Sequence, residues 1–546
     1  SEMTPTRSRL ALLGLCAILL LMCVLRLPSL VAPIWSVDDG THAIIANKIL
    51  EGGLPYRDAV DHRAPLPWYV CALTFLFTGP NNMNALRIVL VGLSGIIIVF
   101  IFLIGRLTVG DKGALFAALL FTIISSVGLD RIGYAFEPEW CLAVFTCLGS
   151  YLFLRGRLFG HSRILSFLSG LSYGLAFFSK QPAIMDFLAP LSFLIYQEAT
   201  KKKLPGVNKF RSSVDCALLL LLGFLTVCVL FFAYFYAKGA WEDFVFYFWT
   251  YNNEYFIPAR PLLKTILMVP MWFLQVSTPM NLGVWVLTGL MIMFLNSAGS
   301  RENEENFRVN VRPYLVIWSV TSFLATIVAG RNYYHYTIQL LPPWCLLSGL
   351  TFKTLFEFLT TIQSAPKGWL RKISLPALLT FLVLLVVIPA LALTCQMAKI
   401  VRDVSRTQPT ELIEWITSHS QENEKIFVWG FSPHLYTLAN RTPASRYPYY
   451  HFQSGFICWV RENHIVPGTM EILLKELHLN RPRIIVDQFA GITHNSYYEM
   501  PMRDFPDLWN FVCENYVFRE QFNEGGVWQL REAIQRKGEA KSRGRD

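Results

Sequence analysis

The chain has 546 residues, of which 53% are hydrophobic and only 16% are charged. A soluble protein usually has about 25% charged residues, so this composition excludes an ordinary soluble fold for most of the chain and indicates a membrane protein. The formal net charge of +10 does not indicate nucleic-acid binding, because most Lys and Arg residues fall between apolar runs, where they report membrane topology. We therefore expect membrane lipids around the chain and no nucleic-acid partner.

Apolar runs recur between Leu10 and Met397. A helix needs about 20 mostly apolar residues to span a bilayer. Two short runs, at 65–79 and 262–276, contain Pro67 and Pro270, and the sequence leaves open whether they cross. This pattern predicts a polytopic α-helical membrane protein with 11 to 13 spans. The eleven longer runs lie near 10–30, 84–105, 113–129, 138–154, 164–179, 183–197, 214–237, 281–296, 312–329, 336–351 and 373–397.

The positions of the basic loops favour the lower count. If neither short run crosses, the strongly basic loops, such as the one at 201–203, share a side with Arg7 and Arg9. The positive-inside rule makes that side the cytoplasm. We therefore expect the short runs to lie in the interface and the N-terminus to lie inside. No small-residue cleavage site follows the first apolar run, so we expect no cleavable signal peptide. The predicted outer loops are 31–83, 130–137, 238–280 and 330–336.

Ionisable residues gather in or beside these outer loops. Charged groups at the edge of a bilayer are costly, so such a cluster indicates a functional site. Arg and Lys with neighbouring Tyr and His donors could hold a lipid phosphate, and a nearby carboxylate could take a proton from an attacking hydroxyl. The residues therefore suit the displacement of a lipid phosphate by an alcohol. The set comprises Asp38, Asp39, Asp58, Asp61, His62, Arg63, Glu137, Lys180 and the stretch Arg331–Tyr336.

The pair Asp38-Asp39 has a second interpretation. Asp favours the N-cap position of a helix, and a short helix is expected at 41–51, before the stop signal Gly52-Gly53. One member of the pair could cap this helix while the other carries chemistry.

Five short motifs occur in order along the membrane part. They are Val37-Asp38-Asp39-Gly40, Tyr56-Arg57-Asp58 leading to Asp61-His62-Arg63-Ala64-Pro65-Leu66, Gly133-Tyr134-Ala135-Phe136-Glu137-Pro138, Phe178-Ser179-Lys180-Gln181-Pro182, and Gly330-Arg331-Asn332-Tyr333-Tyr334-His335-Tyr336 with Gln339 and Pro342-Pro343. With them the chain resembles the membrane glycosyltransferases of the GT-C fold, in particular the bacterial branch related to aminoarabinose transferases and protein O-mannosyltransferases. The resemblance implies a multi-pass protein of the bacterial inner membrane. It also implies inverting transfer from a polyprenyl-phosphate sugar to a hydroxyl of a lipid, glycan or protein acceptor on the non-cytoplasmic face.

The resemblance also suggests roles for individual residues. Asp38 matches the general base and Asp39 its acidic neighbour, and Glu137 stands where the family often has Asp before Pro. Arg63 stands where the family often has Lys, which keeps the charge and allows bidentate phosphate contact. His62 could bind a divalent metal ion, and no other cofactor is expected. The expected phosphate-binding residues are Arg63, Lys180, Arg331, Tyr334 and His335, and the expected acceptor or sugar contacts are Tyr56, Asp58 and Asp61.

The last part of the chain has a different pattern, in which short strands alternate with helices. Helices are expected at 410–418, from 433, at 470–479 and at 504–514, and strands at 425–429, 483–486 and 527–530. Such alternation predicts a small α/β layer. We therefore divide the chain into a transmembrane glycosyltransferase domain at 1–400, an exported α/β domain at 401–535 and a disordered, charged tail at 536–546.

Two other classes of function remain open at this stage. A transporter or flippase of lipid-linked sugars would show paired half-repeats and charged residues near the middle of the bilayer, and the sequence shows neither pattern. A non-catalytic assembly factor would not need the acidic and basic residues of the first outer loop. Transfer of a lipid-linked sugar therefore fits the sequence best.

Overall fold

The computed structural model describes residues 5–159, 162–200, 209–256, 262–299, 310–328, 333–364, 376, 380, 382–455, 464–491 and 500–532. The chain forms two compact units, each built from separate stretches of sequence. The first contains residues 1–31, 87–234 and 262–403, and the second contains 32–86, 235–261 and 404–546. The predicted tail at 536–546 lies outside the described residues.

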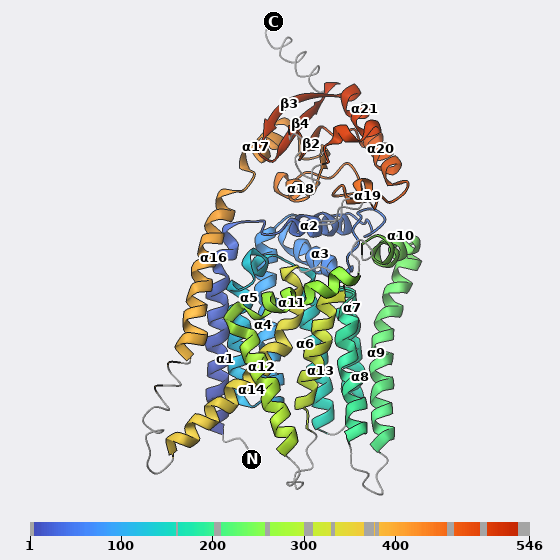
Figure 1. Cartoon of the computed structure of the whole chain (residues 1–546). Helices are drawn as coiled ribbons and strands as arrows, with labels where there is room; N and C mark the ends of the chain where they lie inside the picture. Colours follow the sequence, from blue (N-terminus) through green and yellow to red (C-terminus); the bar gives the residue numbers. More distant parts are fainter. Residues whose placement is uncertain are drawn as a thin grey trace. The chain divides into compact units, whose positions relative to one another are not determined.

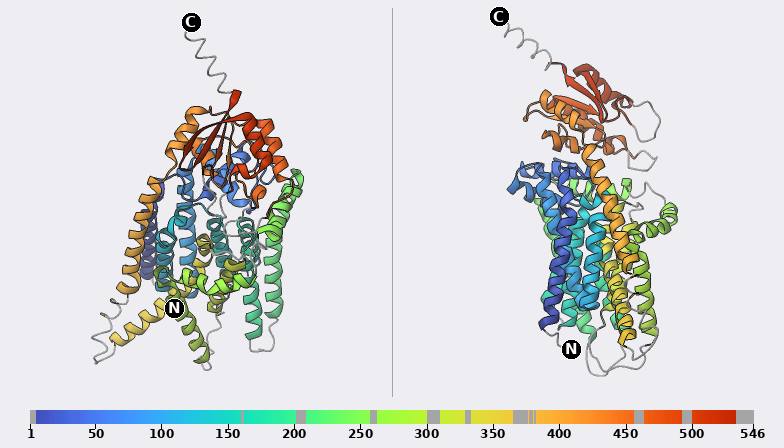
Figure 2. Two further views of the ribbon diagram at one scale, coloured as in Figure 1. Left: turned by 45° about the horizontal axis from the view of Figure 1, so that its top comes forward. Right: turned by 90° about the vertical axis from the view of Figure 1, so that its left-hand side faces the viewer.

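The first unit is helical, and most of its long helices run side by side (Figures 1 and 2). Short 3₁₀ turns, η1 (Leu27–Val31), η2 (Asp130–Tyr134) and η6 (Tyr334–Tyr336), join some of them. The helices that lie wholly or mainly in this unit are α1 (Pro5–Arg26), α4 (Met83–Thr108), α5 (Asp111–Val127), α6 (Pro138–Leu158), α7 (Arg163–Ser179), α8 (Ala183–Thr200), α9 (Lys209–Ala237), α11 (Leu262–Ser277), α12 (Leu282–Gly299), α13 (Arg312–Val328), α14 (Thr337–Ser364) and α16 (Ile388–Arg406).

Within the described part of the chain, six helices are long and apolar enough to cross a membrane. A seventh crossing arises if Ile266–Ser277 and Pro279–Phe294, which are bent by 89° at their junction, count as one span. The bend coincides with Met280, whose φ is 56°. These helices indicate a multi-pass membrane protein. The count of 11 to 13 spans stays a prediction. The short runs at 65–79 and 262–276 are helices, and whether they cross is likewise still a prediction.

Small residues allow close helix crossings in this unit. A Cβ atom added to Gly113 of α5 would lie only 2.6 Å from the carbonyl oxygen of Gly349 in α14. Only glycine permits backbones to approach this closely. The crossing fixes α14 against α5, and the chain that leads into α14 carries residues of the candidate site.

The second unit combines helices with a mixed sheet. The sheet has the order β1-β2-β4-β3, in which β1 and β2 are parallel and the other pairs are antiparallel. Ile426 of β1 pairs with Ile484 of β2, which pairs with Gln529 of β4. The strands are β1 (Ile426–Trp429), β2 (Ile484–Asp487), β3 (Tyr516–Phe522) and β4 (Gly525–Leu530), and the helices are α2 (Val37–Leu50), α3 (Leu66–Thr78), α10 (Trp241–Val245), α17 (Thr410–His419), α18 (His434–Ala439), α19 (His451–Ser454), α20 (Thr469–Asn480) and α21 (Pro506–Asn515).

The core of this unit explains why the short strands form. The residues of β1 and β2 are all buried. They pack with Leu412 and Ile416 of α17, Leu435 of α18 and Ile44 of α2. Burial on both faces produces the continuous apolar runs from which β1 and β2 were predicted. The helices expected at 410–418, from 433 and at 470–479 correspond to α17, α18 and α20. The sequence did not predict β3, because its exposed residues Arg519, Glu520 and Gln521 are polar.

Helix α2 begins earlier than the sequence suggested. The N-cap is Ser36, whose side chain accepts a hydrogen bond from the backbone N–H of Asp38, and Asp39 at the third helical position completes a capping box. The expectation that an Asp residue is the N-cap of a helix at 41–51 is therefore wrong. Ser is as good an N-cap as Asp, and an acidic residue at the third helical position, where Asp39 lies, stabilises the start of a helix.

We expect Gly40→Ala to lower the thermal stability of the protein. The added Cβ would lie 2.4 Å from the backbone nitrogen of His434 at the start of α18, and overpacking of this kind costs about 1 to 3 kcal/mol. Gly92→Ala in α4 is the control, because nothing lies within 4 Å of the added atom. Thermal unfolding in detergent measures both. A Tm for Gly40→Ala equal to that of the Gly92→Ala control would contradict this account.

Candidate active site

The second unit contains a cluster of charged groups around one guanidinium, which we call the Arg63 cluster (Asp38, Asp61, His62, Arg63 and Tyr449). Nη2 of Arg63 lies 2.6 Å from Oδ1 of Asp38, and Nη1 lies 2.7 Å from Oδ2 of Asp61. The hydroxyl of Tyr449 donates to Oδ1 of Asp61 over 2.7 Å. Asp61 is fully buried and also accepts the backbone N–H of His62 over 2.6 Å, so the cluster holds a buried carboxylate through one cation and neutral donors.

The two members of the acidic pair have different environments. Asp38 points to Arg63, and its side chain retains 13% exposure. Asp39 is buried, and its Oδ2 accepts hydrogen bonds from the backbone N–H groups of Trp35 and Ser36 over 2.9 and 3.1 Å. Consecutive residues of a helix point in different directions, so the capping box draws Asp39 away from the direction of its neighbour.

The loop between α2 and α3 is held in shape by Tyr56. Its φ is 72°, it is fully buried, and its hydroxyl donates to the carbonyl oxygen of Arg63 over 2.8 Å. Its ring packs at edge-on angles against Trp68, Phe235 and Phe244. Of the other predicted acceptor contacts, Asp58 accepts from the backbone N–H of Leu54 over 2.8 Å and pairs with its neighbour Arg57. Tyr56 and Asp58 thus fold the loop that presents Arg63.

The electrostatics of the cluster follow from burial and pairing. Burial alone would raise the pKa of Asp61, but Arg63 and the hydrogen bonds from His62 and Tyr449 hold that pKa well below its usual value. Burial would lower the pKa of Arg63, yet Asp38 and Asp61 keep it well above the ordinary value. Burial, with the nearby Arg63, lowers the pKa of His42 and of His62. At neutral pH the cluster therefore contains ionised Asp61 and Arg63 beside the neutral imidazole of His62.

The sequence predicted His62 as a possible metal ligand. Its Nδ1 lies 3.1 Å from Oδ1 of Asp61, and its ring lies against Tyr251 with 5.4 Å between centroids. The side-chain amide of Asn252 donates to its carbonyl oxygen over 2.8 Å. Asn252 belongs to the π-helical segment η4 (Asn252–Phe256), and Tyr251 precedes it, so these contacts hold His62 in place.

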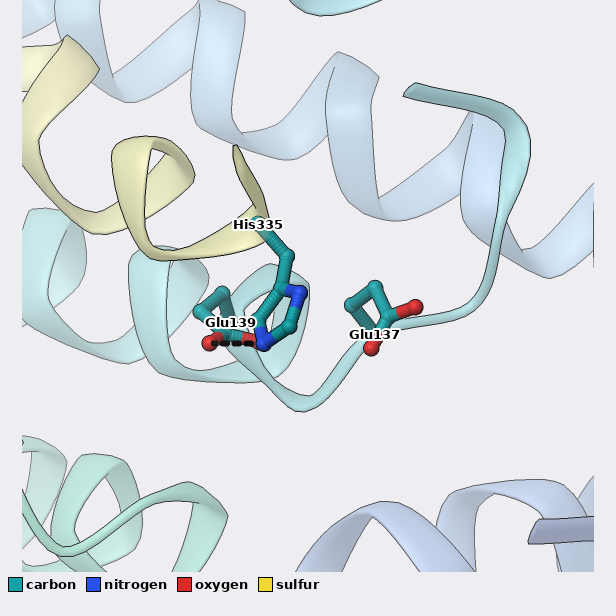
Figure 3. Close-up of side chains that lie close together, drawn as sticks. All are labelled: Glu137, Glu139 and His335. Atoms are coloured by element: carbon teal, nitrogen blue, oxygen red, sulfur yellow. Dashed lines mark ion pairs between the residues drawn. The ribbon is translucent and has the colours of Figure 1, made fainter. Parts of the chain in front are cut away.

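The first unit contains a second group, which we call the Lys180 cluster (Glu137, Glu139, Lys180, His335 and Tyr336). Lys180 forms an ion pair with Glu139, and its Nζ lies 3.6 Å from the centre of the Tyr336 ring. Nε2 of His335 lies 3.8 Å from Oε1 of Glu139. Figure 3 shows Glu137 on the chain before α6, Glu139 at the start of α6 and His335 from the turn before α14.

Two buried arginines hold the chain that leads to this cluster. Arg26 donates from Nη1 to the carbonyl oxygen of Gly133 over 2.8 Å and from Nη2 to that of Ser125 over 3.0 Å. Arg87 donates from Nη1 to the carbonyl oxygen of Tyr134 over 2.9 Å. The Arg26 guanidinium also lies over the ring of Trp140, at 4.6 Å. These bonds position Glu137 and Glu139, because residues 133–134 and Trp140 flank them in the chain.

The structure places most of the predicted site residues in these two clusters. It brings Asp38, Asp61, His62 and Arg63 together in the second unit, and Glu137, Lys180 and His335 together in the first. Tyr334 is 43% exposed in η6, and Arg331 lies outside the described residues. Sequence reasoning missed Glu139, although its position two residues after Glu137 was a signal. From the sequence, Tyr449 is one of several aromatic residues that could touch a glycan or the rim of the active site, and its hydrogen bond to Asp61 was not predicted.

A divalent cation is the cofactor to test against the Lys180 cluster. Ligand atoms of Glu137, Glu139 and His335 all lie within 4.8 Å of one another, and carboxylate and imidazole groups are ordinary ligands of Zn²⁺ and Mn²⁺. However, the ammonium of Lys180 is already bonded to Glu139 and would repel a second cation. As arranged, the cluster does not fit a divalent metal ion.

Comparisons with known proteins agree with the fold that the motifs implied. The family model described as dolichyl-phosphate-mannose-protein mannosyltransferase matches residues 62–231, and no curated protein matches. ArnT from Cupriavidus metallidurans bound to undecaprenyl phosphate is 11% identical with a TM-score of 0.60, over 94% of this chain and 97% of that chain. AglB from Archaeoglobus fulgidus, in complex with an inhibitory peptide and a dolichol-phosphate, is 13% identical with a TM-score of 0.53, over 88% and 70%.

The protein therefore has the GT-C fold of membrane glycosyltransferases, as the motifs suggested. It shares this fold with ArnT and with the archaeal oligosaccharyltransferase AglB.

We expect Asp61→Asn to destabilise the protein at neutral pH by about 3 kcal/mol, because it removes one partner of a buried ion pair. The pKa of Asp61 is lowered in the folded state, so its contribution is present above the unfolded pKa and is lost as the pH falls below about 4. The stability difference between wild type and variant should therefore shrink on acidification.

The control for this prediction is Asp130→Asn. Asp130 is exposed and has a φ of 55°, a conformation that Asn also adopts readily. Thermal unfolding between about pH 7 and pH 3 measures all three proteins. A constant difference between wild type and Asp61→Asn across this range would show that Asp61 is not held ionised.

Proposed function

We propose that the protein transfers a sugar from a polyprenyl-phosphate donor to a hydroxyl of a lipid, glycan or protein acceptor on the non-cytoplasmic face of a bacterial inner membrane. The observation that supports this most is the pairing of the partly exposed carboxylate of Asp38 with Arg63. It occurs in a chain whose fold is shared by proteins whose structures contain undecaprenyl phosphate and dolichol-phosphate.

In this proposal Asp38 is the general base. Arg63 bonds to Oδ1 of Asp38, and we assign Oδ2 to the proton of the acceptor hydroxyl. The acceptor oxygen bonds to the anomeric carbon as the bond from that carbon to the phosphate oxygen breaks. The leaving oxygen keeps the electron pair, and the configuration inverts. Because a lipid phosphate is a good leaving group, one base suffices, unlike the acid and base pair of a glycosidase.

The Lys180 cluster is the proposed binding site for the donor phosphate. Lys180 and His335, with Tyr334 and Arg331, supply the cationic and hydroxyl donors that an oxyanion attracts. Glu139 neutralises Lys180, so a phosphate exchanges with this carboxylate for the same ammonium. Glu139, together with Glu137, then limits the affinity for the lipid product and favours its release.

Asp39 has a different role in this proposal from the one that its position beside Asp38 implied. Its carboxylate already accepts two backbone N–H groups at the start of α2, so we assign it to the orientation of Asp38. Asp61, Tyr56 and Asp58 are assigned to holding Arg63 and its loop, rather than to binding the acceptor.

Substitution of the acidic pair tests the proposed base. We expect Asp38→Asn to lower the rate of sugar transfer by about 10² to 10⁴, the usual contribution of general-base catalysis. Asp39→Asn should lower stability by about 1 kcal/mol through the loss of capping and keep most of the transfer per folded molecule. Transfer from a radiolabelled polyprenyl-phosphate sugar by purified, folded protein is the measurement. Unchanged transfer by Asp38→Asn would refute the assignment.

A chelator tests the assignment of Lys180 as the cation of its cluster. We expect the transfer rate to stay within about twofold when EDTA is added, because the ammonium already neutralises Glu139. Lys180→Met should raise the KM for the donor, since it removes that charge from the phosphate site. If EDTA abolished transfer and Mn²⁺ or Zn²⁺ restored it, the carboxylates and His335 would have to be reassigned as metal ligands.

A further inference from the structure

A carboxyl group outside the proposed chemistry lies buried in the first unit. Asp186 of α8 is fully buried, and its oxygens accept three side-chain hydrogen bonds. Nε1 of Trp318 donates to Oδ1 over 3.1 Å, the hydroxyl of Ser322 also donates to Oδ1, and Nε2 of Gln339 donates to Oδ2 over 2.6 Å. Trp318 and Ser322 belong to α13 and Gln339 to α14. A single carboxyl group therefore joins three helices.

Gln339 lies close in sequence to two residues of the Lys180 cluster. His335 and Tyr336 come from η6, four and three residues before Gln339, and Lys180 comes just before α8. The Asp186–Gln339 bond and the contact of Lys180 with Tyr336 thus join the same two stretches of chain. A shift of Gln339 would move the ring of Tyr336 and the imidazole of His335 relative to Lys180.

The backbone hydrogen bonding at the start of α14 is incomplete. Pro342 and Pro343 lie within the helix and have no N–H groups, so they cannot donate to the carbonyl oxygens of Ile338 and Gln339. The turn that follows η6 therefore lacks two helical hydrogen bonds. The amide of Gln339, held by a buried acceptor, supplies part of the missing restraint.

We infer that Asp186 is a positioning residue that, through Gln339, holds the first turn of α14 so that His335 and Tyr336 stay opposite Lys180. This inference rests on the proposed function, because its consequence is the geometry of the donor-phosphate site. Asp186 itself contacts no substrate in this account. Its effect should therefore fall on donor binding and leave acceptor binding unchanged.

The variant Gln339→Met tests the inference, because it keeps the length of the side chain and removes the donor. We expect the KM for the polyprenyl-phosphate sugar to rise about tenfold, as for the loss of one buried polar contact. The kcat and the KM for the acceptor should stay within about twofold. Ser322→Ala is the matched control, since it removes a donor to the same carboxyl group from α13, and it should leave the donor KM unchanged.

A reversed pair adds a test by rescue. Gln339→Glu alone places two carboxyl groups together and should raise the donor KM further. Asp186→Asn combined with Gln339→Glu restores a donor and an acceptor with the opposite polarity, and should return the donor KM to within about threefold of wild type. If all variants only lowered Tm or kcat and left the donor KM unchanged, Asp186 would be a packing residue and the inference would be wrong.

Lys180→Met distinguishes a failure of the inference from a failure of the proposed function. If Lys180→Met raises the donor KM and Gln339→Met does not, only the positioning role of Asp186 is overturned. If Lys180→Met also leaves the donor KM unchanged, the phosphate site itself is wrongly assigned.

Discussion

The ion pairs of Arg63 with Asp38 and Asp61 are the interaction on which the polar structure of the second unit depends. A buried charge is tolerated only when opposite charges and hydrogen bonds replace water. Here one guanidinium satisfies two carboxylates, and Tyr449 adds a further donor to Asp61. The pairs fix the start of α2, the loop before α3 and the chain before α19 in a single arrangement. Arg63 therefore orients Asp38, as the proposed role of Asp38 as general base requires.

In the first unit, different partners compensate the buried charged groups. Lys180 is paired with Glu139 and lies over an aromatic ring, whereas Arg26 and Arg87 donate to backbone carbonyl oxygens. An ammonium paired with a carboxylate can exchange that partner for a phosphate. Arginines that donate to backbone carbonyl oxygens do not exchange these partners for a phosphate. They hold the chain in place. This difference separates the proposed ligand-binding cation from the structural ones.

The sequence predicted most of the helices, the strands β1, β2 and β4, and most of the charged residues of the two clusters, because burial and the cost of charge near a membrane are visible in the composition. It did not predict the short helices α10 and α19. It also did not predict the partners of those charged residues. Asp38 and Asp39 look alike in sequence, and only the capping box of Ser36 separates them. Tyr449 lies 388 residues from Asp61 in the chain, a distance over which no local pattern carries information. Glu139 and Asp186 lie in the first turns of apolar helices, and their roles depend on which helices pack beside them.

The most direct test of the account is the release of polyprenyl phosphate by the purified protein in liposomes, measured with and without an acceptor. A transferase releases free lipid phosphate only as the sugar appears on the acceptor, in equal amounts. The account predicts this stoichiometry in the wild type and its loss in Asp38→Asn. Movement of the intact donor across the bilayer, with no release of lipid phosphate in the presence of acceptor, would contradict it and identify a flippase instead.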